Sequence, residues 1–449
     1  MAEFLTEAEA RQVCEKVISY SSADAVEVTV VSGSTRFARY ARNEMMGLGD
    51  ASDAEVTVTS AFGQKRATVT WNDLRDAAVE EAVSRAEELA RLARDDPETM
   101  SPLGPQQYLA SAAFFDSTYQ LGDNGLTAAV QAVTERSASS DLIAAGFIQT
   151  RAGSEALLNT AGLFAYHQST LASHTTTVQT TDGLGLGWVG TTHNDWEQMV
   201  PEGELGERAK NRARQSVNAL PVDVGAYTVV LEPPAVASLV QLLQAALVAR
   251  AADEGRSVFS REAGGNRIGE EVIDERFSLL SDPADPDLLA RPFTADGVPL
   301  RHTEWIDNGV LRNLEYDRYW ADRQGRQPQP RGGGIKLTGG EGTLDDMVSI
   351  VDRGLLVTRF WYVRSVDFRR LRYTGLTRDG VFLIEEGRIV RPVSNMRFNE
   401  SIVGIFNNVE AIGSAVRVVA SESGGLGEPV VVPPVVVRDF QFTSLSDAV

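Results

Sequence analysis

Histidine and cysteine, the side chains that most often bind zinc, are rare in this sequence. The 449 residues contain histidine only at positions 167, 174, 193 and 302, and cysteine only at position 14. A single cysteine excludes an internal disulfide framework and is typical of a reducing compartment, so we expect a cytoplasmic location. The stretch between His193 and His302 has no imidazole ligand at all.

Long apolar runs and basic residues are also scarce. No run of 18 apolar residues occurs, so we expect no transmembrane helix and no membrane partner. The first residues, MAEFLTEAEARQ, lack the basic region and apolar core of a signal peptide. Lysine occurs only at positions 16, 65, 210 and 336, and the formal net charge is −20. Nucleic-acid-binding proteins need a basic surface, so we expect no nucleic-acid partner.

The composition is that of a globular protein, with 43% hydrophobic and 23% charged residues. Thr6 and Glu9 form a capping-box pattern that predicts a helix to about Tyr20. Alternating valines at 26–30 predict a half-buried strand. The other elements that we expect before residue 221 are a hairpin at 56–59 and 66–71 around Gly63, a helix at 72–93 capped by Asn72, a Pro-rich connector at 95–108, a helix at 126–136, strands within 140–199 and a helix at 202–220.

These patterns predict an α+β fold. The N-terminal part is an α/β domain with an antiparallel sheet and long helices, and the C-terminal part is rich in β-strands. We expect the main boundary near Pro221–Gly225 and three regions, at 1–105, 106–222 and 223–449. Tyr227–Leu231 is expected to be a buried strand that stops at Pro233. The next helix carries one apolar stripe, at Val236, Leu239, Val240, Leu243 and Leu247.

Residues 375–399, GLTRDGVFLIEEGRIVRPVSNMRFN, contain the strongest local signal. The apolar run Val381–Ile384, a Glu-Glu-Gly turn and Ile389–Val390 predict a hairpin in which the glycine adopts positive φ. Two further blocks enter the same comparison. They are residues 293–319 and the end of the chain, from 398–413 to the VVPP sequence at 431–434. Together these three blocks resemble the C-terminal part of the TldD/PmbA (TldD/TldE) metallopeptidase family, which implies a C-terminal domain of that type.

The resemblance also shows what is missing. Catalytic members carry an HExxxH zinc motif on the helix that follows a VL-x-P strand end, and a cysteine near the C-terminus that resembles a third ligand. Here the region reads VVLEPPAVASLVQLLQAALVARAADEG. The motif positions fall on Gln241, Leu242 and Ala246, which cannot bind zinc or act as a general base. Cys14 lies in the other half of the chain.

In these departures the chain resembles the non-catalytic, TldE/PmbA-like members of the family. The resemblance implies a non-catalytic subunit of a heterodimeric zinc metallopeptidase that processes or degrades unfolded or precursor peptides. The partner would be an HExxxH-bearing TldD-like subunit that holds the zinc, and this chain would have no cofactor of its own. Two alternatives stay open: a divergent metallopeptidase that uses His167, His174 or His193, and a stand-alone protein that binds extended peptides or small molecules.

The remaining candidate residues also have ordinary structural interpretations. His167 and His174, seven residues apart, should lie on opposite faces of a strand. His193 lies near Asp195 and Glu197; this group could be a site, but a loop at the end of a sheet is the preferred interpretation. His302 alternates with Glu304, and two groups do not make a zinc site.

Two loops resemble ligand sites only superficially. Gly332–Gly334 with Lys336 and Thr338 does not have P-loop spacing, and we expect a flexible loop before a helix at 344–353 that Thr343 caps and Gly354 ends. The acidic segment 281–287 could hold calcium but has the composition of a solvated loop. The aromatic stretches 360–362 and 305–306 are candidates for core or for a partner interface.

Overall fold

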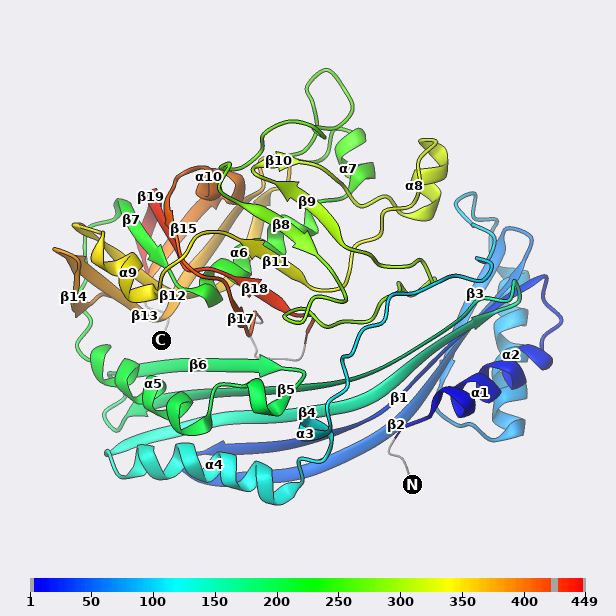
Figure 1. Ribbon diagram of the computed structural model, residues 1–449, viewed down its shortest axis with the longest axis horizontal. Helices are drawn as coiled ribbons and strands as arrows, with labels where there is room; N and C mark the ends of the chain where they lie inside the picture. Colours follow the sequence, from blue (N-terminus) through cyan, green and yellow to red (C-terminus); the bar gives the residue numbers. More distant parts are fainter. Residues whose placement is uncertain (1–3, 421–426, 447–449) are drawn as a thin grey trace.

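The computed structural model describes residues 4–420 and 427–446, and its longest strands form one curved antiparallel sheet (Figure 1). The strand order is β3-β2-β1-β4-β5-β6. The strands are β1 (Ala25–Ala41), β2 (Glu44–Phe62), β3 (Lys65–Trp71), β4 (Leu142–Asn159), β5 (Phe164–Thr180) and β6 (Leu186–His193). The predicted antiparallel sheet is therefore confirmed, and strands on both sides of residue 105 belong to it.

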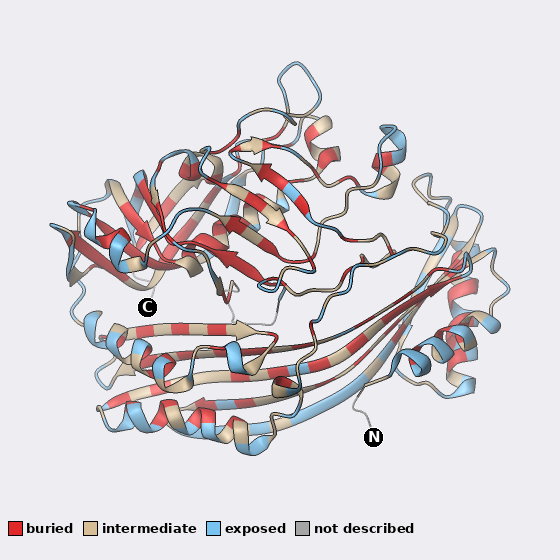
Figure 2. Ribbon diagram, viewed as in Figure 1, coloured by how far each residue is buried: buried red, intermediate tan, exposed pale blue. Residues whose placement is uncertain are grey.

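Helices cover one face of this sheet at both ends, and Figure 2 shows the resulting alternation of buried and exposed residues along the strands. At one end α1 (Glu7–Ser19) and α2 (Asp76–Leu92) pack on Val26, Val28 and Val30. At the other end α4 (Asp123–Ala138) and α5 (Glu202–Gln215) pack on Ala38 and Tyr40 of the same strand. Short helical segments occur at α3 (Asp116–Tyr119) and η1 (Trp196–Gln198). Successive strand residues face opposite sides, so the odd-numbered residues of β1 face away from these helices.

The C-terminal half contains two more sheets and five helices in the part of the chain that is described. One sheet has the order β10-β9-β8-β11-β18-β17. Its strands are β8 (Ser278–Ser281), β9 (Thr303–Asp307), β10 (Val310–Leu311), β11 (Ile335–Thr338), β17 (Val416–Val418) and β18 (Val430–Val432). The helices are α6 (Pro233–Ala245), α7 (Ala249–Asp253), α8 (Arg318–Arg323), α9 (Leu344–Ser349) and α10 (Ile402–Asn407).

The other sheet of this half is closed on itself. Its order is β12-β7-β19-β15-β13-β14, and a further pairing of β12 with β13 joins five of its strands into a ring. The strands are β7 (Gly225–Leu231), β12 (Arg353–Asp367), β13 (Arg372–Glu385), β14 (Arg388–Pro392), β15 (Met396–Ser401), β16 (Val409–Ile412) and β19 (Val435–Leu445). Phe360, Phe398 and Phe440 come from three of these strands, and their ring centroids lie 4.7–5.9 Å apart.

The local sequence signals were accurate where turn or cap chemistry decides the structure. The capping box of Thr6 and Glu9 is present. The β13–β14 hairpin turns through Glu386 and Gly387, with φ values of 48° and 71°. Trp305, Ile306 and Phe360 are buried as expected for core, whereas Tyr362 is exposed.

Three helix boundaries were predicted wrongly. The helix expected at 72–93 begins only after Arg75, because the Asp73 carboxylate accepts bonds from the Arg75 backbone and guanidinium in a preceding turn. The helix expected to reach residue 220 ends at Gln215, and Asn218 adopts a φ of 61°. The helix that Thr343 caps ends at Ser349, since Arg353 already pairs with Glu385 in β12.

The two halves contact each other over the face of the long sheet that the helices leave uncovered. Phe293 packs with Leu157, Leu163 and Ala165, and the Tyr108 hydroxyl donates to the Gly297 carbonyl at 2.9 Å. Among the described residues, no helix is long and apolar enough to cross a membrane.

Candidate functional site

Helix α6 occupies the position that the sequence analysis assigns to a zinc motif. Pro233 and Pro234 open the helix at its first two positions, rather than only stopping the strand before it. The predicted stripe of Val236, Leu239, Val240, Leu243 and Leu247 is fully buried, although Leu247 lies just beyond the helix end. The helix packs against β12 of one C-terminal sheet and β17 and β18 of the other.

The three motif-equivalent residues do not form a metal site. Gln241 is exposed, whereas Leu242 and Ala246 are partly buried against the apolar core. Their amide, isobutyl and methyl groups offer neither imidazole nor carboxylate, so the donor set does not fit zinc. Over the described ranges, no group of three or more His, Cys, Asp or Glu side chains is arranged to hold a metal ion.

The carboxylate directly before α6 is already engaged. Glu232 is 4% exposed, and the Arg212 guanidinium of α5 donates to it and to the Trp188 carbonyl. Burial raises the pKa of Glu232, and Arg212 opposes that rise. This ion pair joins the N-terminal domain to the start of α6, so we interpret Glu232 as a structural group.

A second buried ion pair lies beside the same helix. Arg359 and Asp379 are 3.1 Å apart, and both side chains are 7% exposed. The Arg359 guanidinium lies 4.3 Å from the centre of the Trp188 ring. Burial raises the pKa of Asp379, while Arg359 lowers it. The surroundings of α6 are therefore apolar groups and closed ion pairs.

The histidines of the alternative metal set are not brought together. His167 and His174 lie on opposite faces of β5, as predicted. His174 faces the helices, where its Nε2 is 3.0 Å from the Tyr40 hydroxyl, and burial lowers its pKa to about 3. His193 ends β6, where its Nδ1 accepts from the Asp195 backbone at 2.9 Å. Burial and then Arg417 lower the pKa of His193.

The other candidate residues serve as local structural contacts. The side chain of His302 is 54% exposed and its Nδ1 lies 3.3 Å from Asp282. Lys336 belongs to strand β11 and donates to Asp285 and Asp287 at 3.0 and 2.7 Å. Lys336 therefore ties the acidic loop to β11 and serves as a structural contact.

Cys14 lies far from α6 in the sequence and in the fold. Its side chain is buried between α1 and the long sheet. Burial raises the pKa of the thiol to about 12, so it is neither a nucleophile nor a ligand at neutral pH.

Three adjoining cavities lie between the long sheet and the C-terminal domain. The largest, about 650 Å³, is bordered by the start of β1, the β2–β3 turn, residues 98–102 and Asp317–Tyr319. The second, about 300 Å³, shares Asp296, Asp317 and Arg318 with it. The third, about 340 Å³, shares Arg291 and Glu428 with the second. We call this series the interdomain groove, and its length suits an extended ligand.

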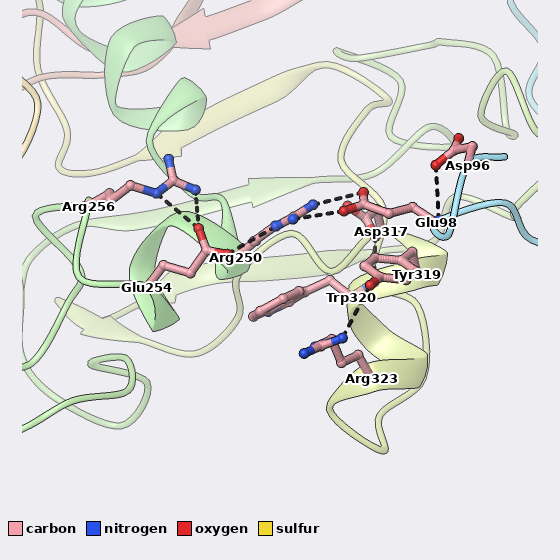
Figure 3. A network of polar contacts seen from close by, with 9 residues as sticks. All are labelled: Asp96, Glu98, Arg250, Glu254, Arg256, Asp317, Tyr319, Trp320 and Arg323. Carbon is pink, nitrogen blue, oxygen red and sulfur yellow. Dashed lines mark hydrogen bonds and ion pairs between the residues drawn. The ribbon is translucent and has the colours of Figure 1, made fainter. Parts of the chain in front are cut away.

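A charged network holds the groove together at its wide end (Figure 3). Arg250 of α7 donates to both oxygens of Glu98, at 2.9 and 2.8 Å, and so ties the C-terminal domain to the connector. Arg250 also donates to Glu254 at 3.2 Å, and its guanidinium lies 5.3 Å from the Trp320 ring centre. These contacts fix the wall of the groove rather than offer a free binding group.

Among the residues that line the third cavity, the sequence analysis singled out only His167 as a candidate. The alternation of β4 places Arg151, Gly153 and Glu155 on one face, and this part was accessible from the sequence. Their pairing with Val31 and Gly33 on one side and His167 and Ser169 on the other depends on strand register. Arg291 and Glu428 come from loops far away in the chain, and no local pattern marks them.

The C-terminal domain has known relatives. Residues 224–444 match the PmbA/TldA metallopeptidase C-terminal domain. The C-terminal domain of this chain belongs to the TldD/PmbA family.

Individual TldD/PmbA relatives agree with this assignment. A metalloprotease PmbA homolog of Haemophilus influenzae is 23% identical over 417 residues, 87% of each chain. A metalloprotease of Methanothermobacter thermautotrophicus is 24% identical over 245 residues, so that the chain spans about half the length of that relative. The structure of TldE from Thermococcus kodakarensis superposes with a TM-score of 0.82 at 17% identity, covering 96% of this chain and 99% of that one. This likeness confirms the α+β fold.

Proposed function

We propose that this chain is the non-catalytic subunit of a two-subunit TldD/PmbA-type metallopeptidase that processes or degrades unfolded or precursor peptides in the cytoplasm. The partner is a homologue with the HExxxH motif, and it holds the zinc. The observation that carries this proposal is the chemistry of α6, where Gln241, Leu242 and Ala246 stand at the motif positions.

The packing of α6 supports a structural role for this chain in the complex. Leu239, Val240 and Leu243 of α6 are fully buried in the largest core cluster, so the helix is retained as scaffold. Burying apolar area of this kind stabilises the domain independently of any metal. The chain thus keeps the family fold while its helix lacks ligands.

The interdomain groove supports the peptide part of the proposal. It runs through three adjoining cavities between two domains, which is a common place for ligand binding. An unfolded peptide can lie along such a surface through its ends and main chain, with little demand on its sequence.

The experiment is co-expression of this chain with its HExxxH-bearing homologue. We expect a complex that survives size-exclusion chromatography and cleaves an unstructured peptide, while this chain alone shows no activity. The control replaces the motif glutamate of the partner, which should leave the complex intact and abolish cleavage. Full activity of the partner alone, with no complex, would contradict the proposal.

A further inference from the structure

The third cavity of the groove lies over three rows of residues on β1, β4 and β5, and its lining includes Val31, Arg151, Gly153, Glu155, His167, Ser169 and Leu171. The strand register places Val31, Glu155 and His167 in one row. The row two residues further along contains Gly33 and Gly153. Rows that are two residues apart on one face are separated by about 7 Å.

The middle row contains two glycines, which have no side chains to fill the space above the strands. A Cβ on Gly33 would lie 2.8 Å from the Ala152 carbonyl oxygen, and one on Gly153 would lie 2.6 Å from the Ser32 carbonyl oxygen. Both positions therefore require glycine, because the two backbones approach closely there. The consequence is a trough across the strands in which Ser169 is the one side chain of the middle row.

The last row brings a free cation to one end of the trough. Arg151 pairs with Leu171 across β4 and β5, and both residues line the cavity. Arg151 is exposed. It has no hydrogen-bond or ion-pair partner among residues 4–420 and 427–446. An unpaired guanidinium at this end is suited to bind a carboxylate in a bidentate manner.

A largely buried histidine lies at the other end of the trough. His167 is 9% exposed, and its Nε2 is enclosed without a hydrogen-bond partner in the described part of the chain. A buried polar nitrogen without a partner is uncommon, and this one is enclosed rather than open to the cavity. Burial, followed by the nearby Arg291, lowers the pKa of His167 to about 4. The ring is therefore neutral at pH 7 and can accept a hydrogen bond.

An ion pair lies beside His167, and a further carboxylate borders the cavity. Arg291 is held by Glu155, so this pair is neutral overall. Glu428 borders the cavity where it meets the second one, and it has no partner within the ranges that the structure describes. The cavity thus offers one free cation at the Arg151 end and one free carboxylate, Glu428, where it meets the second cavity.

We propose that this cavity binds a short zwitterionic peptide, with its α-carboxylate on Arg151 and its α-ammonium on Glu428. Arg151 and Glu155 are four residues apart on one strand, which corresponds to about 13 Å. Three extended residues span roughly 10 Å, so a tripeptide matches the trough. The volume of about 340 Å³ lies at the lower end of the range for ligand sites.

The choice of a peptide as ligand rests on the proposed function, but the site belongs to this chain alone. The test therefore uses the isolated chain and trialanine, and it does not require the partner or any peptidase activity. Failure of the complex to form would not affect it, and failure of trialanine to bind would leave the complex unaffected.

Isothermal titration calorimetry at pH 7.5 and low salt should show one trialanine bound per chain. Trialanine amide and N-acetyl-trialanine should each bind at least tenfold more weakly. Arg151→Gln should remove the preference over the amide and keep the preference over the N-acetyl peptide, while Glu428→Gln should do the reverse. Both side chains are exposed, so both variants should fold normally.

The matched control is Arg39→Gln. Arg39 is an exposed arginine at an odd position of β1, on the same face but outside the cavity. It should leave trialanine affinity unchanged. Absence of saturable binding up to about 10 mM, or equal weakening by Arg39→Gln and Arg151→Gln, would overturn the proposal.

Discussion

Helix α6 and the floor of the interdomain groove differ in the way that their polar groups are satisfied. Around α6 the apolar stripe is closed, and the neighbouring Glu232 and Asp379 are paired with arginines. On the groove floor, Arg151 and the Nε2 of His167 have no partner among the described residues. The charged groups beside α6, at the position of the family's zinc motif, are therefore paired. The groove floor carries no motif, and it has polar groups without a partner among the described residues.

The functional site of this chain therefore need not be at α6, where catalytic relatives hold their metal. A fully packed helix contributes stability, whereas an exposed and unpaired side chain such as Arg151 is available to bind a ligand. The two regions can therefore be tested separately, because substitutions in α6 should change stability and those in the groove should change binding.

The largest expected effect is on stability, from Leu243→Ala in α6. Leu243 is 0% exposed within the main core cluster, so the variant should lose about 2–5 kcal/mol of unfolding free energy. Denaturant unfolding measures this. Gln241→Ala, on the exposed side of the same helix, is the control and should change stability by less than about 0.5 kcal/mol. Equal stability of the two variants would mean that the buried face has been misassigned.

A smaller effect should come from pH, through His174 on the helix-covered face of β5. Burial lowers its pKa from 6.5 to about 3, so the unfolded state binds more protons between these values. Its contribution is present above pH 6.5 and is lost as the pH falls toward 3. From pH 7 to pH 5 this amounts to about 2 kcal/mol.

Urea unfolding at several pH values tests this prediction. His174→Gln should lose that part of the acid sensitivity, whereas His302→Gln, at an exposed position, should retain the wild-type slope. An unchanged slope in His174→Gln would contradict the assignment of His174 to the protein interior.

The smallest expected effect concerns activity. Restoring the motif with Gln241→His, Leu242→Glu and Ala246→His should give no peptidase activity, because Cys14 is too far away to supply a third ligand. Leu242→Glu alone should cost roughly 1–3 kcal/mol, since Leu242 packs partly against the core. A peptidase assay with added zinc measures the outcome, and clear activity would show that the remaining ligands were misidentified.

The sequence predicted those parts of the molecule that local chemistry determines. The capping box at Thr6, the turn at Glu386–Gly387 and the buried stripe of α6 follow from residue types at short spacing. The missing zinc motif was also readable from the sequence. The closed ring of β12 and β13, however, depends on pairings between distant strands.

The groove could not be predicted for the same reason. His167 was recognised as facing away from His174, but its neighbour Glu155 and the loop residue Arg291 meet it only through register and domain packing. Helix ends were missed where a side chain or a backbone turn replaced the expected cap, as at Asp73 and Asn218.

Zinc content tests most directly whether this chain is a non-catalytic subunit whose partner holds the metal. The chain should be purified alone, saturated with zinc, desalted and examined by elemental analysis, and the same should be done for its complex with the HExxxH-bearing homologue. We expect a negligible amount of zinc in this chain alone and about one zinc per complex. About one tightly held zinc per isolated chain, together with peptidase activity that survives removal of contaminating peptidases, would contradict it.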